Sequence, residues 1–500
     1  MSGKRLLFTI HRWLGVFMCL FFAMWFASGV VMMYVEYPEL TEQERLANLP
    51  ALSISDISVP VERILKADRM DGRLASVKLT SIGNRPAYQL RTRDDRLKSV
   101  YADTGEIFGG SDEDQAIAAV MSSGFWLPGT ALHYEQSLDM DQWTVSSALN
   151  RHRPLHKVSL EDERGTVVYV SDHTGQIVRD TNRHERFWNW FGSTLHWIYP
   201  YQLRRHADVW ADVIIYLSLL GILSVLTGIV IGLMRLRLKK RYKGDNISPY
   251  TGAAWWHHLL GLISSIFVTT YIFSGLMSMG PWGIFDARSS FREQVDRYSG
   301  TLDLQQYPSL TGQSVPKDIK EIDWVTVGSE GHLVLSRSAD DRVATISSEE
   351  HAVGLLQQRI DRAIPHLSPE NQITSVNMLR DYDSYYYARH NRYRPLPVYR
   401  VKFDDLESTW FHIDATTGTV VTRHTDKSRL ERWLFNGLHS LDFIFLIERG
   451  VLWDIVVIIL STVGFVFSVT SVIVAWRSVT SRSAITKKSL VNNTIRARVD

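Results

Sequence analysis

The chain has 500 residues, 22% of them charged, and a formal net charge of +2. This balance gives no reason to expect a nucleic-acid partner. Cys19 is the single cysteine, which excludes disulfides, iron–sulfur clusters and thiolate zinc sites within one chain. Metal chemistry would therefore depend on the 17 histidines, on carboxylates or on a bound cofactor.

Four segments are nearly free of charge and about 20 residues long, the length that crosses a bilayer core. In chain order they are 14–34, 213–234, 259–279 and 455–476. The segments between them, 35–208 and 280–451, are polar. The sequence therefore predicts a membrane protein with large extramembrane parts.

Basic residues beside the apolar segments predict the orientation. Lys4, Arg5 and Arg12 precede the first segment, six basic residues lie within 235–243, and the tail after 476 is also basic. These flanks belong in the cytoplasm, so both large polar segments lie outside it. The first apolar segment is longer than a signal peptide and has no clear cleavage site, so we expect it to be retained.

Several segments of the sequence occur twice in the same order, which indicates an internal duplication. HRWLGVFMCLFFAMWFASG (11–29) returns as HHLLGLISSIFVTTYIFSG (257–275), each opening on histidine, with glycine four residues later, and closing on Ser-Gly. Arg-Pro-Leu at 153–155 recurs at 394–396. The stretches 167–178 and 410–421 both alternate around a Thr-Gly turn, which predicts hairpins.

The second part of each half repeats as well. ERFWNWFGSTLHW (185–197) is echoed by ERWLFNGLHS (431–440), and in both copies a tryptophan follows the histidine after 14 residues. Each half is thus predicted to be a span, an outer α+β domain, an interfacial helix and a second span. Because both halves begin in the cytoplasm, they would be parallel repeats around an axis along the membrane normal.

The predicted fold class is an α-helical membrane protein with α+β extramembrane domains, and with four transmembrane helices in two parallel repeats. The expected parts are the cytoplasmic N-terminus with the first span (1–35), the first outer domain (36–182), an interfacial helix with the second span (183–236), a basic cytoplasmic loop (237–254), the third span (255–281), the second outer domain (282–427), an interfacial helix with the fourth span (428–477) and a basic tail (478–500).

Two histidines of each half recur at matching positions, His11 with His257 and His196 with His439. The first two lie at the cytoplasmic interface and the other two at the outer interface. A twofold axis brings equivalent residues together, so one flat metal cofactor could take one histidine from each half. Two imidazoles alone underfill a tetrahedral zinc site, whereas they complete the axial ligands of a haem iron.

The surroundings of these histidines suggest supporting roles. Gly15 and Gly261, one turn after His11 and His257, would allow a ring or a helix to approach closely. Arg12 is placed to meet haem propionates, and its counterpart His258 is a neighbour or an alternative ligand. Four tryptophans near the outer histidines could flank a second ring or form an interfacial belt: Trp188, Trp190, Trp197 and Trp433.

The remaining features of the outer segments are less specific. The stretch YDSYYYARHNRYRPLP (382–397) could receive an anionic or aromatic ligand, although a domain loop can have the same composition. Five histidines lie outside the repeat pattern, and their role is open: His133, His152, His156, His390 and His412.

HRWLG, HHLLG, the two hairpins, RPLPVYRVKFDD (394–405) and the two Leu-His helices together resemble the PepSY-associated transmembrane family, over about residues 5–477. The resemblance implies a bacterial inner-membrane protein, often iron-regulated, with PepSY-like periplasmic domains. Characterised members are haem-binding reductases of ferric siderophores. It also implies b-type haem ligated by His11, His257, His196 and His439.

The resulting hypothesis is an electron-transfer enzyme with two bis-histidine haems that reduces a periplasmic ferric siderophore or other ferric chelate. The electron donor could be a quinol, a flavin or a separate reductase. One alternative is a non-enzymatic, membrane-anchored PepSY binding or inhibitory module. Another is an iron or solute transporter that uses hydroxyl ligands, for which Ser264, Thr269 and Thr270 are the residues to examine.

Overall fold

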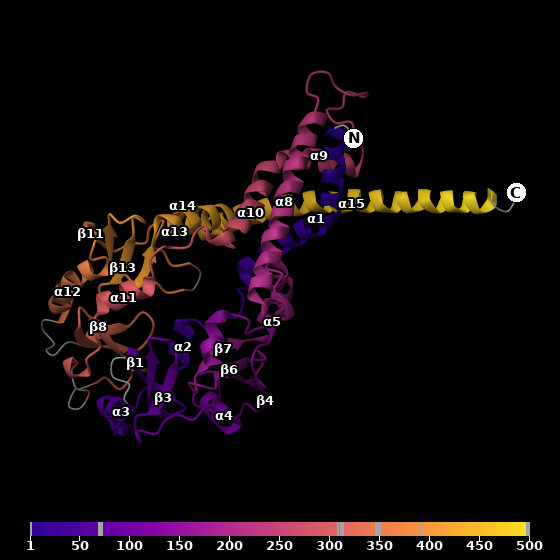
Figure 1. Ribbon diagram of the computed structural model, residues 1–500. Helices are drawn as coiled ribbons and strands as arrows, with labels where there is room; N and C mark the ends of the chain where they lie inside the picture. Colours follow the sequence, from indigo (N-terminus) through magenta and orange to yellow (C-terminus); the bar gives the residue numbers. More distant parts are fainter. Residues whose placement is uncertain are drawn as a thin grey trace. The chain divides into compact units, whose positions relative to one another are not determined.

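The computed structural model describes residues 3–68, 74–307, 310, 315–345, 352–389 and 392–496 (Figure 1). The chain divides into two compact units. The helical unit consists of Met1–Tyr37, Phe187–Ile284 and Glu431–Asp500. The outer unit consists of Pro38–Arg186 and Phe285–Leu430.

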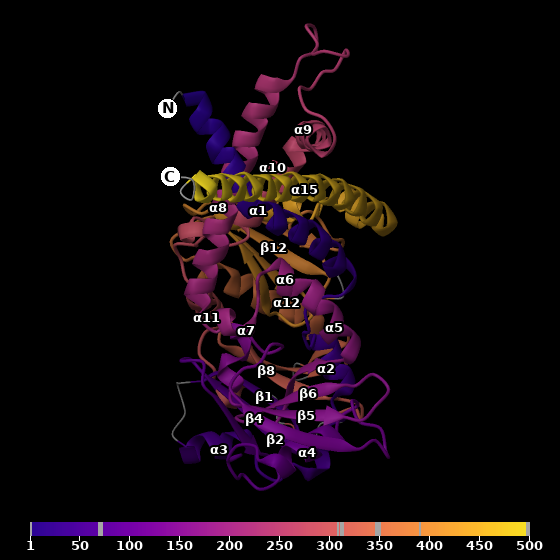
Figure 2. The same cartoon turned by 90° about the vertical axis from the view of Figure 1, so that its right-hand side faces the viewer.

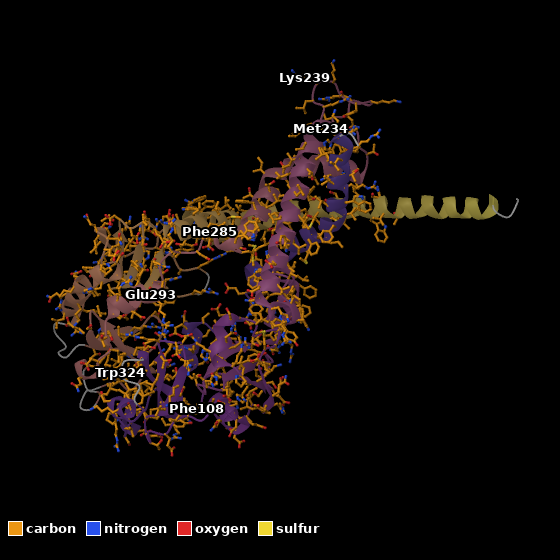
Figure 3. The ribbon with its side chains drawn as sticks, viewed as in Figure 1. Phe108, Met234, Lys239, Phe285, Glu293 and Trp324 are labelled. Atoms are coloured by element: carbon orange, nitrogen blue, oxygen red, sulfur yellow. The ribbon has the colours of Figure 1, made fainter. Side chains whose placement is uncertain are left out.

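Long apolar helices build the helical unit. α1 packs against α8 and α15, and α15 also contacts α9 (Figure 2). The helices of this unit are α1 (Gly3–Tyr34), α5 (Arg183–Phe191, whose first four residues belong to the outer unit), α6 (Ser193–His196), α7 (Tyr201–Arg204), α8 (Ala207–Arg235), α9 (Ala253–Ile263), α10 (Ser265–Met277), a 3-10 helix (Pro281–Gly283), a π-helix (Arg432–Gly437), α14 (Ile444–Ile447) and α15 (Gly450–Arg496). Met234 and Lys239 lie at the tip of this unit, where α8 ends and the basic loop begins (Figure 3).

Three of the four expected spans are continuous helices. α1, α8 and the part of α15 from 450 to 480 are each long and apolar enough to cross a membrane. The expected third span is instead broken, because α9 and α10 meet at Ser264 with a bend of 69°. The described residues therefore contain three helices that can span a bilayer, or four if the bent pair counts as one span. An apolar sequence indicates that a segment is buried in lipid or protein, but it does not indicate whether the helix axis is straight.

The helical unit has an apolar core built largely from α1 and α10. Met18, Phe22 and Phe26 on α1 pack against Val268 and Ile272 on α10. The side chains on α1 recur every four residues, so they form one stripe along the helix. This contact sets α1 beside the broken third helix over its middle turns.

Three antiparallel sheets form the outer unit. The largest has six strands in the order β10-β9-β8-β1-β2-β3. Its strands are β1 (Leu74–Ile82), β2 (Arg85–Thr92), β3 (Leu97–Tyr101), β8 (Glu321–Val327), β9 (Glu330–Ser336) and β10 (Arg342–Thr345). β1 comes from the first polar segment and β8 from the second, and they pair directly, with Lys78 opposite Asp323. The prediction of one outer domain in each segment did not include this shared sheet.

A buried ionic cluster joins the two segments at that seam. Glu321 on β8 is almost fully buried and accepts two hydrogen bonds from Arg45, at 2.7 and 2.6 Å, and one from Lys78, at 2.9 Å. Arg45 belongs to α2 (Glu42–Asn48) and Lys78 to β1. Burial alone would raise the pKa of Glu321, but the two cations hold that pKa well below its ordinary value.

The other two sheets have the same strand order. One is β4-β5-β6-β7 and the other β11-β12-β13-β14. Their strands are β4 (Leu132–Leu138), β5 (Leu155–Leu160), β6 (Val167–Ser171), β7 (Ile177–Thr181), β11 (Ile373–Leu379), β12 (Val398–Phe403), β13 (Trp410–Asp414) and β14 (Val420–His424). The hairpins expected at 167–178 and 410–421 are β6–β7 and β13–β14.

The register of these sheets corrects one sequence match. β5 begins at Leu155, opposite Ser171, and β12 begins at Val398, opposite Asp414, so equivalent strand residues are 243 positions apart. The Arg-Pro-Leu match of 153–155 with 394–396 implied a shift of 241 and was wrong by two residues. Strand alternation and hairpin length set the register, and a tripeptide identity has no influence on either.

Helices cover the outer sheets. They are α3 (Val61–Asp68), α4 (Glu113–Met121), α11 (Phe291–Ser299) and α12 (Ala352–Ala363), whereas α13 (Asp426–Glu431) follows β14 and has no buried residue. α4 packs on the β5 and β6 strands through Ala116 and Val120, whereas α12 packs beside β13 through Leu356 and Ile360. Each small sheet thus has one apolar face beneath a helix.

Candidate histidine sites in the helical unit

All four matched histidines lie in the helical unit, where they form two pairs. His11 on α1 and His257 on α9 form the inner pair, with ring centroids 6.4 Å apart. His196 at the end of α6 and His439 just after the π-helix form the outer pair, with ring centroids 6.0 Å apart. The structure therefore brings together the residues that the sequence paired by position.

His11 of the inner pair is held against α8. Its Nδ1 lies 3.1 Å from the carbonyl oxygen of Ser224 and 3.3 Å from the hydroxyl of Thr227. The ring occupies the space beside Gly228, where a Cβ atom would come within 2.8 Å of the ring carbon Cε1. Only glycine leaves room for the imidazole at this position, because any larger side chain would overlap it.

His257 of the inner pair is held against α15. Its Nδ1 lies 3.0 Å from the hydroxyl of Ser471, and its ring stacks on Phe467 at 5.2 Å with an interplanar angle of 10°. Gly261 allows this stacking, because a Cβ atom there would be 2.9 Å from the Phe467 ring. Gly261 therefore provides the close helix approach that we expected, whereas Gly15 has no atom within 4 Å of its Cβ position.

The outer pair is held by the two Ser-Gly pairs of the repeated segments. The Ser28 hydroxyl lies 3.0 Å from Nδ1 of His196, and the Ser274 hydroxyl lies 3.1 Å from Nδ1 of His439. The following glycines, Gly29 and Gly275, each place their Cβ position 3.5 Å from Cε1 of the same imidazole. In both halves, therefore, a serine hydroxyl contacts the histidine, and the next residue is a glycine that leaves space beside the imidazole.

A matching turn follows each outer histidine. Ile198 and Leu441, two residues after His196 and His439, have φ angles of +48° and +54°. Residues other than glycine rarely adopt this conformation. The indole of Trp210 donates a hydrogen bond to the Trp197 carbonyl at 2.9 Å, and that of Trp453 donates to the Ser440 carbonyl at 2.8 Å. In both halves, the 14-residue spacing therefore brings the tryptophan indole back to a carbonyl next to the histidine.

The two pairs lie at opposite ends of α1. This helix supplies His11 near its start and Ser28 near its end. Seventeen residues of α-helix rise about 25 Å, which is close to the thickness of a bilayer core of about 30 Å. One pair for each membrane face is the arrangement that the sequence predicts.

The spacing of each pair fits a flat metal group between the rings. With metal–nitrogen bonds of about 2 Å on both sides, and about 1 Å from each nitrogen to its ring centroid, coaxial imidazoles have centroids about 6 Å apart. The observed separations are 6.4 and 6.0 Å. Among the described residues no group of three or more His, Cys, Asp or Glu side chains surrounds either pair. A porphyrin supplies the remaining ligands of an iron ion, so the residues fit haem better than a bare ion.

His258 does not fit the ligand role that we considered for it. It is buried, with Nδ1 2.8 Å from the Ser248 hydroxyl and Nε2 2.9 Å from the Gly232 carbonyl. Both ring nitrogens are engaged, so His258 ties α9 to α8 and we remove it from the candidate ligands. Arg12 donates to the Ser478 hydroxyl at 3.0 Å, and its role toward propionates stays a prediction.

The tryptophans near the outer pair are mostly exposed. Trp188, Trp190 and Trp197 present much of their surface, as expected of an interfacial belt. The rings that contact His439 are instead Tyr271, at 5.6 Å, and Phe435, at 5.5 Å. Sequence reasoning missed Tyr271, Ser28 and Ser274 as neighbours of the histidines, although the recurring Ser-Gly at the end of each repeated segment was a usable signal.

A family model described as PepSY-associated TM region matches residues 8–477, nearly the whole chain. The protein belongs to this family. Its PepSY-associated transmembrane character agrees with the apolar helices and the α+β outer unit, so the chain is a membrane protein. No curated protein matches it.

In this family member, two of the histidines outside the repeat pattern sit in hydrogen-bonded networks of the outer unit. His156 lies between the Tyr134 hydroxyl and the Asp172 carboxylate, both at 3.0 Å. His412 accepts a hydrogen bond from Arg400 at 2.8 Å and stacks on Tyr386. Of the other three, His133 is exposed beside Glu161, His152 contacts Ser171, and His390 lies outside the described residues.

The Tyr-rich stretch covers one face of the β11–β14 sheet. Asp383 forms two hydrogen bonds with Arg400, at 2.6 and 2.8 Å, and the Tyr386 hydroxyl donates to the Pro395 carbonyl. Burial raises the pKa of Asp383, but its hydrogen bonds with Arg400 outweigh this effect and lower that pKa to about 2. These contacts are those of a docked structural loop, and substrate binding there stays a prediction.

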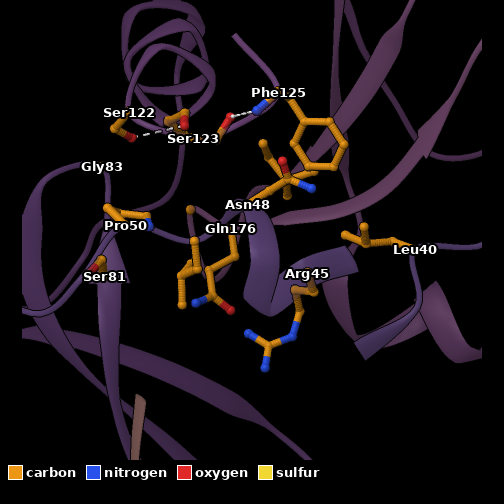
Figure 4. Close-up of a pocket in the computed structure, with 14 residues that line it drawn as sticks. Leu40, Arg45, Asn48, Pro50, Ser81, Gly83, Ser122, Ser123, Phe125 and Gln176 are labelled. Carbon is orange, nitrogen blue, oxygen red and sulfur yellow. Dashed lines mark hydrogen bonds between the residues drawn. The ribbon is translucent and has the colours of Figure 1, made fainter. Parts of the chain in front are cut away.

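Described residues of the outer unit border cavities of different sizes. A cavity of about 390 Å³ is bordered by Glu39, Arg342, Arg392 and Asp414 among others, and it lies beside the Tyr-rich stretch. A second, of about 30 Å³, lies among Arg45, Asn48, Ser123 and Gln176 (Figure 4). The smaller one has room for about one water molecule and no ligand.

Proposed function

We propose that this protein carries electrons across the membrane to an oxidised acceptor on the outer side, with two haem groups as carriers. The observation that supports this most strongly is the pair of histidine pairs, with ring centroids 6.4 and 6.0 Å apart at opposite ends of α1. Haem supplies reversible one-electron chemistry when bound between two imidazoles. The acceptor that fits best is a ferric siderophore or another ferric chelate in the periplasm.

The protein's own residues have three tasks in this proposal. His11 and His257 would hold the inner haem, and His196 and His439 the outer one. Each imidazole is kept in place by a hydroxyl on a neighbouring helix, and the apolar core around Phe22 and Phe26 excludes water between the sites. No general acid or base is required, because the acceptor gains one electron and ferric iron becomes ferrous. The electron comes from a quinol, a reduced flavin or a reductase on the inner side.

The expected topology follows the same reasoning. The basic loop after α8 and the basic tail support a topology with both termini in the cytoplasm of a bacterial inner membrane and the outer unit in the periplasm. Ferrous iron is held less tightly than ferric iron by hard oxygen ligands because its charge is lower. Electron delivery to this side would therefore release iron from a chelate.

A transporter is the second candidate, and the 69° bend at Ser264 favours it, because broken helices often line transport sites. The hydroxyl groups of Ser264, Thr269 and Thr270 all donate to carbonyls four residues earlier in their own helices. They are thus engaged in ordinary helix contacts. A PepSY binding module remains the third candidate.

The test is the visible spectrum of the purified full-length protein, recorded after dithionite reduction and after air oxidation, with haem quantified per chain. We expect sharp α and β bands and about two haems per chain. His11→Ala or His257→Ala should remove one haem, and His196→Ala or His439→Ala the other. His133→Ala is the matched control, because this histidine is exposed and belongs to the outer unit.

A second measurement addresses the acceptor. The dithionite-reduced protein is mixed with a ferric trihydroxamate, and reoxidation is followed in the α band. The gallium complex of the same chelator has the same charge but cannot accept an electron, so it should leave the band unchanged. A colourless wild-type protein, expressed with ample haem supply, would refute the electron-transfer proposal.

A further inference from the structure

Each of the four histidines contacts a hydroxyl group through the same ring nitrogen. The bonds run from Nδ1 to Thr227 for His11, to Ser471 for His257, to Ser28 for His196 and to Ser274 for His439. The four hydroxyls come from four different helices, α8, α15, α1 and α10. The contact is thus repeated at every candidate ligand.

Each hydroxyl also lies within hydrogen-bonding distance of a carbonyl in its own helix. Ser28 donates to the Met24 carbonyl at 2.7 Å, and Ser274 donates to the Tyr271 carbonyl at 3.0 Å. In the inner pair, Thr227 donates to the Leu223 carbonyl at 2.8 Å and Ser471 to the Phe467 carbonyl at 3.1 Å, each within its own helix. A hydroxyl has one proton and two lone pairs, so a hydroxyl that keeps its bond to the helix carbonyl accepts from the imidazole.

With the hydroxyl as acceptor, the tautomer of each histidine follows. Nδ1 must carry the hydrogen in order to donate it, and a neutral imidazole has only one such hydrogen. Nε2 therefore keeps its lone pair, which is the form that binds a metal. Two backbone carbonyls reinforce this, since Ser224 also accepts from His11 at 3.1 Å and Tyr271 from His439 at 3.2 Å.

We propose that Ser28, Ser274, Thr227 and Ser471 are positioning residues that fix the Nδ1-protonated tautomer and the ring orientation of the haem ligands. This inference rests on the proposed haem function. Hydrogen-bond partners of ligand histidines typically change metal affinity by about 10- to 100-fold when they are removed. An acceptor at Nδ1 also increases the electron density on the imidazole, which stabilises ferric relative to ferrous iron and lowers the reduction potential.

In the outer site, the two consecutive residues of each Ser-Gly pair lie beside the imidazole. Serine supplies the acceptor, and the next residue, Gly29 or Gly275, leaves the imidazole free to lie against the helix backbone. A side chain at either glycine would begin in contact with Cε1 of the histidine, at 3.5 Å.

The experiment compares Ser28→Ala, Ser274→Ala and the double variant with wild type in the full-length protein. Apoprotein is titrated with haem, and the midpoint potential of each site is measured by spectroelectrochemistry. We expect haem affinity at the outer site to fall about 10- to 100-fold in the double variant, with a more positive outer potential and an unchanged inner site. Thr227→Val with Ser471→Ala should affect the inner site alone.

Two controls separate positioning from general packing. Ser461→Ala removes another buried serine of the helical unit and should change neither site. Ser28→Thr keeps an acceptor and should restore the outer potential. If the double variant keeps wild-type haem affinity and potential at both sites, this inference is refuted while the haem proposal stands. A wild-type protein that binds no haem would instead refute the proposed function itself.

Discussion

Replacing Glu321 by glutamine should destabilise the outer unit strongly. Glutamine keeps the volume of the side chain but removes the negative charge that faces Arg45 and Lys78 at 2.6–2.9 Å. The carboxylate is about 1% exposed, and the two cations are 18% and 28% exposed. Water therefore reaches the two cations only in part, and breaking such a buried pair typically costs about 3–5 kcal/mol.

The pH dependence of the wild type gives an independent check on the same group. The pKa of Glu321 is lowered in the folded state, so its stabilising contribution is complete above its ordinary pKa of 4.5 and is lost as the pH falls below that value. The glutamine variant should lack this acid-dependent loss. The difference in stability between the two proteins should therefore shrink as the solution is acidified.

The assay is pulse proteolysis of the full-length, detergent-solubilised protein over a urea series, with the cleavage sites of the outer unit identified by mass spectrometry. Arg96→Ala is the control, because it removes an ion pair with Asp94 in which both side chains are mostly exposed. We expect that control to leave the midpoint unchanged. Adding Lys78→Met to the glutamine variant should recover part of the lost stability. A loss below about 1 kcal/mol for Glu321→Gln would show that this cluster does not hold the β1–β8 seam.

Three further predictions concern the sites and the docked loop. Gly228→Ala should displace His11 and lower stability by about 1–3 kcal/mol through overpacking. It should also weaken haem binding at the inner site in the same titration. Gly15→Ala should change neither stability nor haem binding, because no atom lies within 4 Å of that Cβ position. Trp453→Phe removes the hydrogen bond to the Ser440 carbonyl, so the unfolding free energy of the helical unit should fall by about 0.5–1.5 kcal/mol, measured by thermal unfolding. Asp383 has a pKa of about 2, so its ion pair should hold the Tyr-rich stretch above about pH 4 and release it as the pH falls towards 2. Protease cleavage within 382–397 should then rise. Asp383→Asn should allow that cleavage at neutral pH as well.

The sequence by itself was sufficient for the features that depend on composition and on position along the chain. Apolar length located the membrane helices, because a bilayer imposes a minimum length on each of them. Strand alternation around Thr174-Gly175 and Thr417-Gly418 located two hairpins. Matching positions in the two halves selected His11 and His257 among 17 histidines, and the structure places these two rings 6.4 Å apart.

The tertiary structure decided the features that depend on contacts between distant residues. The partners of the histidines lie far from them in sequence, as Ser28 does from His196 and Ser471 from His257, so even the recurring Ser-Gly pairs could not show which histidine each serine contacts. The same holds for the shared six-stranded sheet, in which β1 and β8 pair across about 240 residues. Composition and periodicity report whether a residue is buried and in which kind of element. They do not report which helix or strand lies opposite, because that depends on how the side chains of all the elements pack together.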